Sequence, residues 1–187
     1  MLKILAAFLS LLFLPGVSVS AIDCPFLVEE PVLVTSVGQN FDALMVKTIF
    51  DEMGVIADLA PMVEAGALSQ YRQLVISPGI SYKGMVASGT TVEEEIERTK
   101  AIVEASFEYN LPIMLMYLGG FIQGDAKSQE LIELVAPSAD LIIIYRDSGG
   151  PIDYLVSVAR EQQVPVYFID SLKNICEELK VLISTSE

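Results

Sequence analysis

Apolar and polar positions form alternating blocks along the chain, with strand-length apolar runs separated by stretches of helical periodicity. Short runs rich in Val, Ile, Leu and Met predict β-strands. The runs at 113–118 and 141–145 are almost entirely apolar, which is typical of strands buried on both faces of a parallel sheet. We expect strands at Val32–Ser36, Val55–Leu59, Gln73–Ser77, Ile113–Leu118, Leu141–Tyr145 and Val166–Ile169.

Helical signals lie between these runs. Asn40 is expected to cap a helix that reaches Met53. A capping box at Thr91–Glu94 begins a helix that reaches about Tyr109. Further helices are expected at Ser128–Val135, from Pro151 to about Gln162, and after Ser171. The buried face of the first helix is expected to carry Phe41, Leu44, Met45, Ile49 and Met53.

Strict alternation of strand and helix predicts an α/β domain. We expect a three-layer, doubly wound fold, Rossmann-like or flavodoxin-like, with a mainly parallel sheet of five to six strands and helices on both faces. The order of the strands cannot be read from the sequence. Both common orders place a topological switch point beside the first strand.

The amino terminus is typical of a secretory signal. Lys3 precedes an apolar run at Ile4–Leu14, and Val19-Ser20-Ala21 is a small-residue cleavage site. We expect residues 1–21 to be a signal peptide cleaved near Ala21, and residues 22–187 to form one domain that is exported to the periplasm or the cell exterior.

Export makes the two cysteines relevant, because exported proteins can keep disulfides. A Cys24–Cys176 bridge would tie down the mature amino terminus. Two unpaired thiols are the alternative. Lipid attachment at Cys24 is disfavoured by Asp23, where a lipoprotein signal has a small uncharged residue.

Composition narrows the classes of partner and reaction. With 187 residues, 52% of them hydrophobic, the chain can bury a full core. A formal net charge of −14 disfavours nucleic acid and anionic membranes. The absence of histidine excludes Ser-His-Asp and Cys-His catalysis and histidine metal ligands. No catalytic residue, metal site or cofactor is predicted, since the sequence has no G-x-G-x-x-G after the first strand, no Walker lysine and no calcium loop.

Four predicted strands end in turns rich in Gly and Ser, and in a parallel sheet these turns share the edge where such folds bind ligands. Backbone N–H groups at the first turn and the cations Lys83 and Arg146 would suit a polar or anionic ligand. Plain turns, a flexible loop at Pro78–Thr90 and a surface ion pair of Arg146 are the structural alternatives. The candidate ligand-binding residues are Ser36, Gly38, Gln39, Ser77, Gly79, Ser81, Lys83, Tyr117, Gly119, Gly120, Arg146 and Ser148.

Acidic residues cluster at the start of the helix that follows this loop. Glu93, Glu94, Glu95 and Glu97 are expected to be a solvated face favoured by the helix dipole. The capping of a last helix is the expected use of Asp170 and Ser171.

Several sequence motifs resemble those of a known family. They include the Ser-x-Gly-Gln turn at Ser36–Gln39, the loop at Lys83-Gly84, the strand that ends in Gly119-Gly120, and the Ala-Pro-x-Ala-Asp phrase at Ala136–Asp140. The chain resembles, from about Pro31 to Leu172, an exported bacterial domain-of-unknown-function family, catalogued as number 6305. The resemblance implies a Rossmann-like exported domain and no established activity. Family members often carry arginines after the Gly-Gly turn, where this chain has Phe121-Ile122-Gln123.

Three functional hypotheses follow. The first is an extracytoplasmic domain that binds a small polar or anionic molecule at this edge and presents it to a membrane protein. The second is a hydrolase or transferase that pairs Ser81 or Ser77 with a neutral Lys83. The third is a non-catalytic interaction subunit with an exposed apolar patch. Ligand identity and oligomeric state are not encoded in any pattern we recognise.

Overall fold

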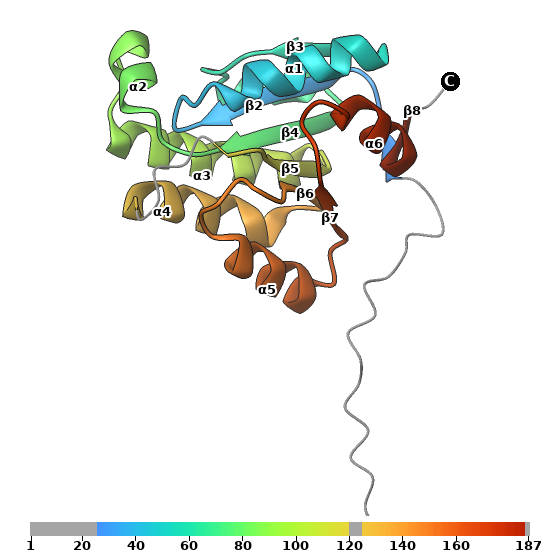
Figure 1. Ribbon diagram of the computed structural model, residues 1–187. Helices are drawn as coiled ribbons and strands as arrows, with labels where there is room; N and C mark the ends of the chain where they lie inside the picture. Colours follow the sequence, from blue (N-terminus) through green and yellow to red (C-terminus); the bar gives the residue numbers. More distant parts are fainter. Residues whose placement is uncertain (1–25, 120–124, 186–187) are drawn as a thin grey trace, which may run out of the picture.

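Six parallel strands form the central sheet of the computed structural model, which describes residues 26–119 and 125–185 (Figure 1). The strand order is β3-β2-β4-β5-β6-β7, and every neighbouring pair is parallel. Counted along the chain within this sheet, the order is 2-1-3-4-5-6, which is the flavodoxin-like alternative with one added strand. The strands are β2 (Val32–Val37), β3 (Ala57–Leu59), β4 (Gln73–Pro78), β5 (Ile113–Tyr117), β6 (Leu141–Tyr145) and β7 (Val166–Ile169).

Helices cover both faces of the sheet, so the predicted fold class is confirmed (Figure 1). One face packs on α1 (Asp42–Met53) and α6 (Ile175–Leu182). The other packs on α3 (Val92–Glu108), α4 (Ala126–Val135) and α5 (Ile152–Gln162). Successive side chains of a strand enter opposite layers, as with Leu33 and Val34 in β2.

Short elements complete the chain. They are the strands β1 (Phe26–Val28) and β8 (Ile183–Thr185), the helix α2 (Tyr82–Ser88), and the 3-10 turns η1 (Ala65–Gln70) and η2 (Ala136–Ser138). Strands β1 and β8 pair in parallel as a separate two-stranded sheet that joins the two ends of the domain. This pairing was not predicted, because three-residue strands carry almost no periodicity.

One local prediction is right only in part and another is wrong. Of the residues expected on the buried face of α1, Ile49 is buried and Met45 and Met53 pack partly against the core, whereas Phe41 and Leu44 are 71% and 54% exposed. Ala43, Val46 and Phe50 complete the buried face. The stretch expected to be a loop at Pro78–Thr90 contains helix α2, which Ser81 begins and Gly89 ends.

The predicted signal peptide at residues 1–21 lies outside the described residues. In the part of the chain that is described, no helix is both long and apolar enough to span a bilayer.

Candidate functional site

The predicted ligand-binding residues lie where β2, β4, β5 and β6 end, at what we call the carboxyl edge of the sheet (Figure 1). Because all four strands run parallel, their following turns meet at this edge. Gly120 lies outside the described residues. The other eleven residues form three groups: a packed group at the first two turns, a more exposed group at α2 and the end of β6, and the buried Tyr117 and Gly119 at the end of β5.

The turns after β2 and β4 are bound directly to each other. The Gly79 N–H donates to the Val37 carbonyl at 2.9 Å, and the Ser81 N–H donates to the Gly38 carbonyl at 2.8 Å. Gly38 has φ +92°, and a Cβ there would lie 2.5 Å from the Gly79 carbonyl oxygen. Glycine is therefore required at position 38 by close packing of two turns as well as by backbone conformation.

Asn40 is the centre of this packed group. Its Nδ2 donates to the carbonyls of Ser77 (2.8 Å) and Gly79 (3.1 Å). Its Oδ1 accepts the Asp42 N–H at 3.0 Å and the Ser77 hydroxyl at 3.3 Å. The N-cap of α1 is Phe41, one residue after the predicted Asn40, and the Asn40 side chain instead accepts the first N–H of the helix. Asn40 also joins two strand ends, which the sequence does not indicate.

Glu95 corrects the expectation of a solvated acidic face. Its side chain is fully buried, and its Oε2 accepts the Gly38 N–H at 2.7 Å. Its Oε1 accepts Gln39 Nε2 at 3.0 Å. The backbone donor that was expected to hold an anionic ligand therefore binds a carboxylate of the chain itself.

Arg98 neutralises this buried carboxylate. Its Nη2 lies 2.8 Å from Glu95 Oε2 and also donates to the Ser36 carbonyl at 2.6 Å. Burial by itself raises the pKa of Glu95, but the Arg98 and Gly38 hydrogen bonds outweigh it and hold the pKa below its usual range. Sequence reasoning missed this pair, although Glu95 precedes the inward residues Thr99 and Ile102 by four and seven positions, on the same helix face.

Helix α2 uses the serine that was a candidate nucleophile. Ser81 Oγ accepts the Gly84 N–H at 3.1 Å and so caps the helix. Gly84 packs against the Gln39 carbonyl, where a Cβ would collide with backbone. The side chain of Lys83 is exposed, so the burial that would keep a lysine neutral is not provided.

Arg146 forms the surface ion pair that the sequence left as an alternative. Its Nε donates to Asp170 Oδ1 at 2.6 Å, and its guanidinium lies 4.6 Å from the centroid of the Phe168 ring. Asp170 was expected to cap the last helix, but here it pairs with Arg146. Beside it, the Ser148 hydroxyl donates to the Gly149 carbonyl at 3.3 Å, and Ser148 lies next to Gly119.

Three buried oxygens at the carboxyl edge have no hydrogen-bond partner among the described residues. They are Ser36 Oγ, Asp42 Oδ2 and the Tyr117 hydroxyl. Ser36 is the register partner of Ser77, and Ser77 and the Asp42 N–H share the same Asn40 oxygen. We call Ser36, Asp42 and Tyr117 the edge triad.

Burial and charge link two members of the edge triad. Burial raises the pKa of Asp42 to about 6. Burial also raises the pKa of Tyr117, and the nearby carboxylate of Asp42 raises it further. Asp42 begins α1, which covers one face of the sheet, whereas the Tyr117 side chain packs in the layer on the other face; the two residues share the carboxyl edge.

Asp42→Asn should stabilise the protein at neutral pH. A pKa raised on folding means that the folded state favours protonated Asp42; this contribution is present below about pH 4 and lost as pH rises to about 6. The loss is on the order of 2 kcal/mol, larger than the 0.3–1 kcal/mol by which the helix N-terminus favours the charge. Urea unfolding at pH 4 and pH 8 should show the variant gaining stability only at pH 8. If Asp42→Asn and the wild type differ in unfolding free energy by the same amount at pH 4 and pH 8, the raised pKa of Asp42 is contradicted.

One groove also opens at the carboxyl edge. It has a volume of about 680 Å³ and lies between Gln39, Ser88 and the segment that links β3 to η1. Of the predicted ligand-binding residues, only Gln39 lines it. Gln39 Nε2 is already bound to Pro61 O and Glu95, and its Oε1 accepts the Ser88 hydroxyl.

The acidic residues and the two cysteines are the remaining candidates for metal or thiol sites. Within residues 26–119 and 125–185, no three Asp, Glu or Cys side chains gather as metal ligands would. The Cys176 thiol donates to Glu52 at 3.2 Å. Cys24 lies outside the described residues, so the Cys24–Cys176 bridge stays a prediction.

Comparisons with known proteins point to a family but to no activity. No curated protein matches the chain. Among solved structures, it is similar to the psychrotrophic esterase EstA from Pseudoalteromonas sp., with 9% identity over 74% of this chain and 75% of that chain and a TM-score of 0.31. It is also similar to AlinE4, an SGNH-hydrolase family esterase, with 12% identity over 78% and 77% of the two chains and a TM-score of 0.30. Likenesses at this level carry no argument about what the chain does.

A family model, by contrast, covers most of the described domain. The model of a domain of unknown function, DUF6305, matches residues 29–183, a span that includes the whole central sheet, the edge triad and the Glu95–Arg98 pair. The chain therefore belongs to the DUF6305 family.

Proposed function

We propose that this domain binds a small polar molecule at the carboxyl edge, through Ser36, Asp42 and Tyr117. The observation that carries the proposal is the edge triad itself, three buried oxygens without a protein partner among the described residues. More than nine in ten buried polar groups in proteins are hydrogen-bonded. An unsatisfied one costs about 1–3 kcal/mol, so three at the same edge of the sheet favour a bound molecule that completes them.

The chemistry of the site favours a ligand that donates hydrogen bonds. Asp42 is a buried acceptor, and no cationic side chain among the described residues forms an ion pair with it. A hydroxyl, amide or amine group would satisfy Asp42 Oδ2 and also suit the Ser36 hydroxyl.

Anions fit this part of the edge poorly. The Gly38 N–H, the donor that would otherwise receive one, is taken by Glu95. A bound anion would also face the carboxylate of Asp42, and the net charge of the chain is −14. We therefore narrow the earlier expectation of a polar or anionic ligand to a neutral or amine-bearing one.

Tyr117→Phe tests the proposal because it separates stability from binding. Removal of an unpartnered buried hydroxyl should leave the melting temperature unchanged or slightly raised. The same change should abolish stabilisation by a ligand that needs this hydroxyl. Thermal unfolding should be followed with ethanolamine, acetamide, acetate and inorganic phosphate, for the wild type, Tyr117→Phe, Lys83→Ala and Arg146→Ala.

We expect ethanolamine or acetamide to raise the melting temperature of the wild type and of Lys83→Ala, but not of Tyr117→Phe. A ligand at 100 times its dissociation constant adds about 2.7 kcal/mol of stability. In the opposite outcome, acetate or phosphate stabilises the wild type but not Arg146→Ala. That result would contradict the proposal and favour an anion site at Arg146, after the end of β6. An equal shift in Tyr117→Phe would also contradict it.

A further inference from the structure

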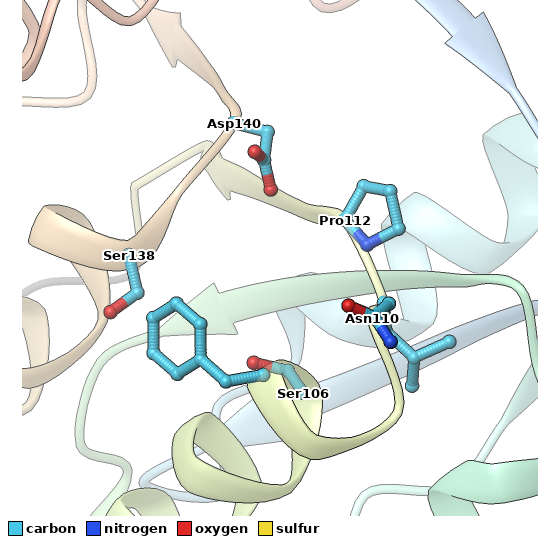
Figure 2. Close-up of a pocket in the computed structure, with 7 residues that line it drawn as sticks. Ser106, Asn110, Pro112, Ser138 and Asp140 are labelled. Atoms are coloured by element: carbon cyan, nitrogen blue, oxygen red, sulfur yellow. The ribbon is translucent and has the colours of Figure 1, made fainter.

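A second cavity lies at the opposite edge of the sheet, where β5 and β6 begin (Figure 2). It has a volume of about 270 Å³, enough for one small ring. Its walls come from the end of α3, the segment that leads into β5, and the turn between η2 and β6. The lining residues are Ser106, Phe107, Asn110, Leu111, Pro112, Ser138 and Asp140.

The frame of this cavity is held by backbone hydrogen bonds. The Asp140 N–H donates to the Ile113 carbonyl, and Asp140 Oδ2 accepts the Ile113 N–H, both at 2.8 Å. The Leu111 N–H donates to the Ser106 carbonyl at 2.8 Å and closes the end of α3. Two strand starts and a helix end are thus fixed in position by backbone groups and by one oxygen of Asp140.

The polar groups of the cavity remain available. Among the described residues, no hydrogen bond involves the side chains of Asn110 or Ser138, and only one oxygen of Asp140 is engaged. These three side chains offer amide, hydroxyl and carboxylate groups within one small space (Figure 2). A partner that satisfies them must both donate and accept hydrogen bonds, which is the property of a hydroxyl group.

Phe107 adds an apolar surface to the same space. Its side chain is 65% exposed, and it lines the cavity together with Ser106 and Ser138. An aromatic ring beside several hydrogen-bonding groups matches a molecule with one C–H face and a rim of hydroxyls. An anion would be opposed by Asp140, and a metal ion would find only one carboxylate.

We propose that this cavity is a binding site for a neutral polyhydroxylated ring, a monosaccharide unit or a cyclitol. Phe107 contacts the C–H face of the ring. Asn110, Ser138 and the free oxygen of Asp140 hydrogen-bond its hydroxyls. The site is separate from the edge triad, which lies at the other end of the same strands.

The test uses backbone amide NMR spectra of the protein during titration with glucose, mannose, N-acetylglucosamine and myo-inositol. At least one of these should move the amide signals of residues 106–112 and 138–140 in a saturable way. Phe107→Ala should weaken binding by about tenfold. Asn110→Gly removes the amide but suits the positive φ of +53° at this position, and should weaken binding by about fivefold.

Two variants serve as controls. Phe41→Ala removes an equally exposed phenylalanine, 71% exposed and at the carboxyl edge, and should leave ring binding unchanged. Tyr117→Phe should also leave it unchanged, so failure here is distinguishable from failure of the edge triad. The proposal is overturned if none of the four compounds moves these signals, or if Phe107→Ala and Asn110→Gly bind as the wild type does.

Discussion

Glu95→Ala should lower the free energy of unfolding at pH 7 by about 3–5 kcal/mol, the range for removal of one partner of a buried ion pair. The substitution leaves the mostly buried Arg98 without its carboxylate and the Gly38 N–H without its acceptor. It also frees Gln39 Nε2 from one of its two acceptors. Urea unfolding monitored by circular dichroism measures the loss.

Glu97→Ala is the matched control, since Glu97 is on the same helix and its pair with Lys100 is exposed. That change should cost less than about 0.5 kcal/mol. Because binding partners lower the pKa of Glu95, its contribution is present above the ordinary glutamate pKa and lost as pH falls below it. A loss in Glu95→Ala no larger than in Glu97→Ala, or one that does not shrink in acid, would contradict the role assigned to Glu95.

Gly38→Ala should cost about 3 kcal/mol, the second largest effect we expect. A Cβ at this position would lie 2.5 Å from the Gly79 carbonyl oxygen, a backbone atom that cannot rotate away. Residue 38 also has φ +92°, where a side chain adds strain of about 1–3 kcal/mol. The two turns that carry Ser36 and Ser77 would have to separate, so ligand stabilisation should fall as well.

Gly54→Ala distinguishes contact from backbone strain. Gly54 has φ +80°, but a Cβ there would meet no atom within 4 Å. Gly54→Ala should therefore lower the free energy of unfolding only by the cost of placing a side chain at positive φ, about 1 kcal/mol. Equal losses in Gly38→Ala and Gly54→Ala would show that the two turns do not pack as described.

Local patterns were enough to predict the layers of this fold. Consecutive apolar residues such as those of β6, Leu141 to Ile144, have no exposed face, and this alone indicates a sheet covered on both sides. Strand order depends instead on which strands pair across long connections. No short-range pattern encodes that choice, and only the structure distinguishes the flavodoxin-like order.

The partly wrong face of α1 shows the limit of periodicity. Phe41 and Leu44 have helical spacing, but so do Ala43, Val46 and Phe50. The second set is buried because its direction matches the sheet beneath it. Where two apolar arcs overlap on one helix, tertiary packing decides between them.

The sequence predicted which turns gather at the carboxyl edge, but not the side-chain contacts that hold them there. Glycine and serine after strands correctly marked the carboxyl edge. The partners that fix this edge lie far away in sequence, as with Gly38 and Glu95, which are 57 residues apart. The run of acidic residues at 93–97 suggested a solvated helix face, but Glu95 within it is buried. Its partners Gly38 and Gln39 are far away in sequence, so only the three-dimensional structure shows this.

A crystal structure at atomic resolution tests the central claim most directly, on protein purified gently from an exporting host and paired with its native mass spectrum. We predict density for a small organic molecule within about 3 Å of Ser36 Oγ, Asp42 Oδ2 and the Tyr117 hydroxyl, and a matching added mass. Ordered water alone at these three oxygens, with the bare mass of the chain, would contradict the proposal that the edge triad holds a ligand.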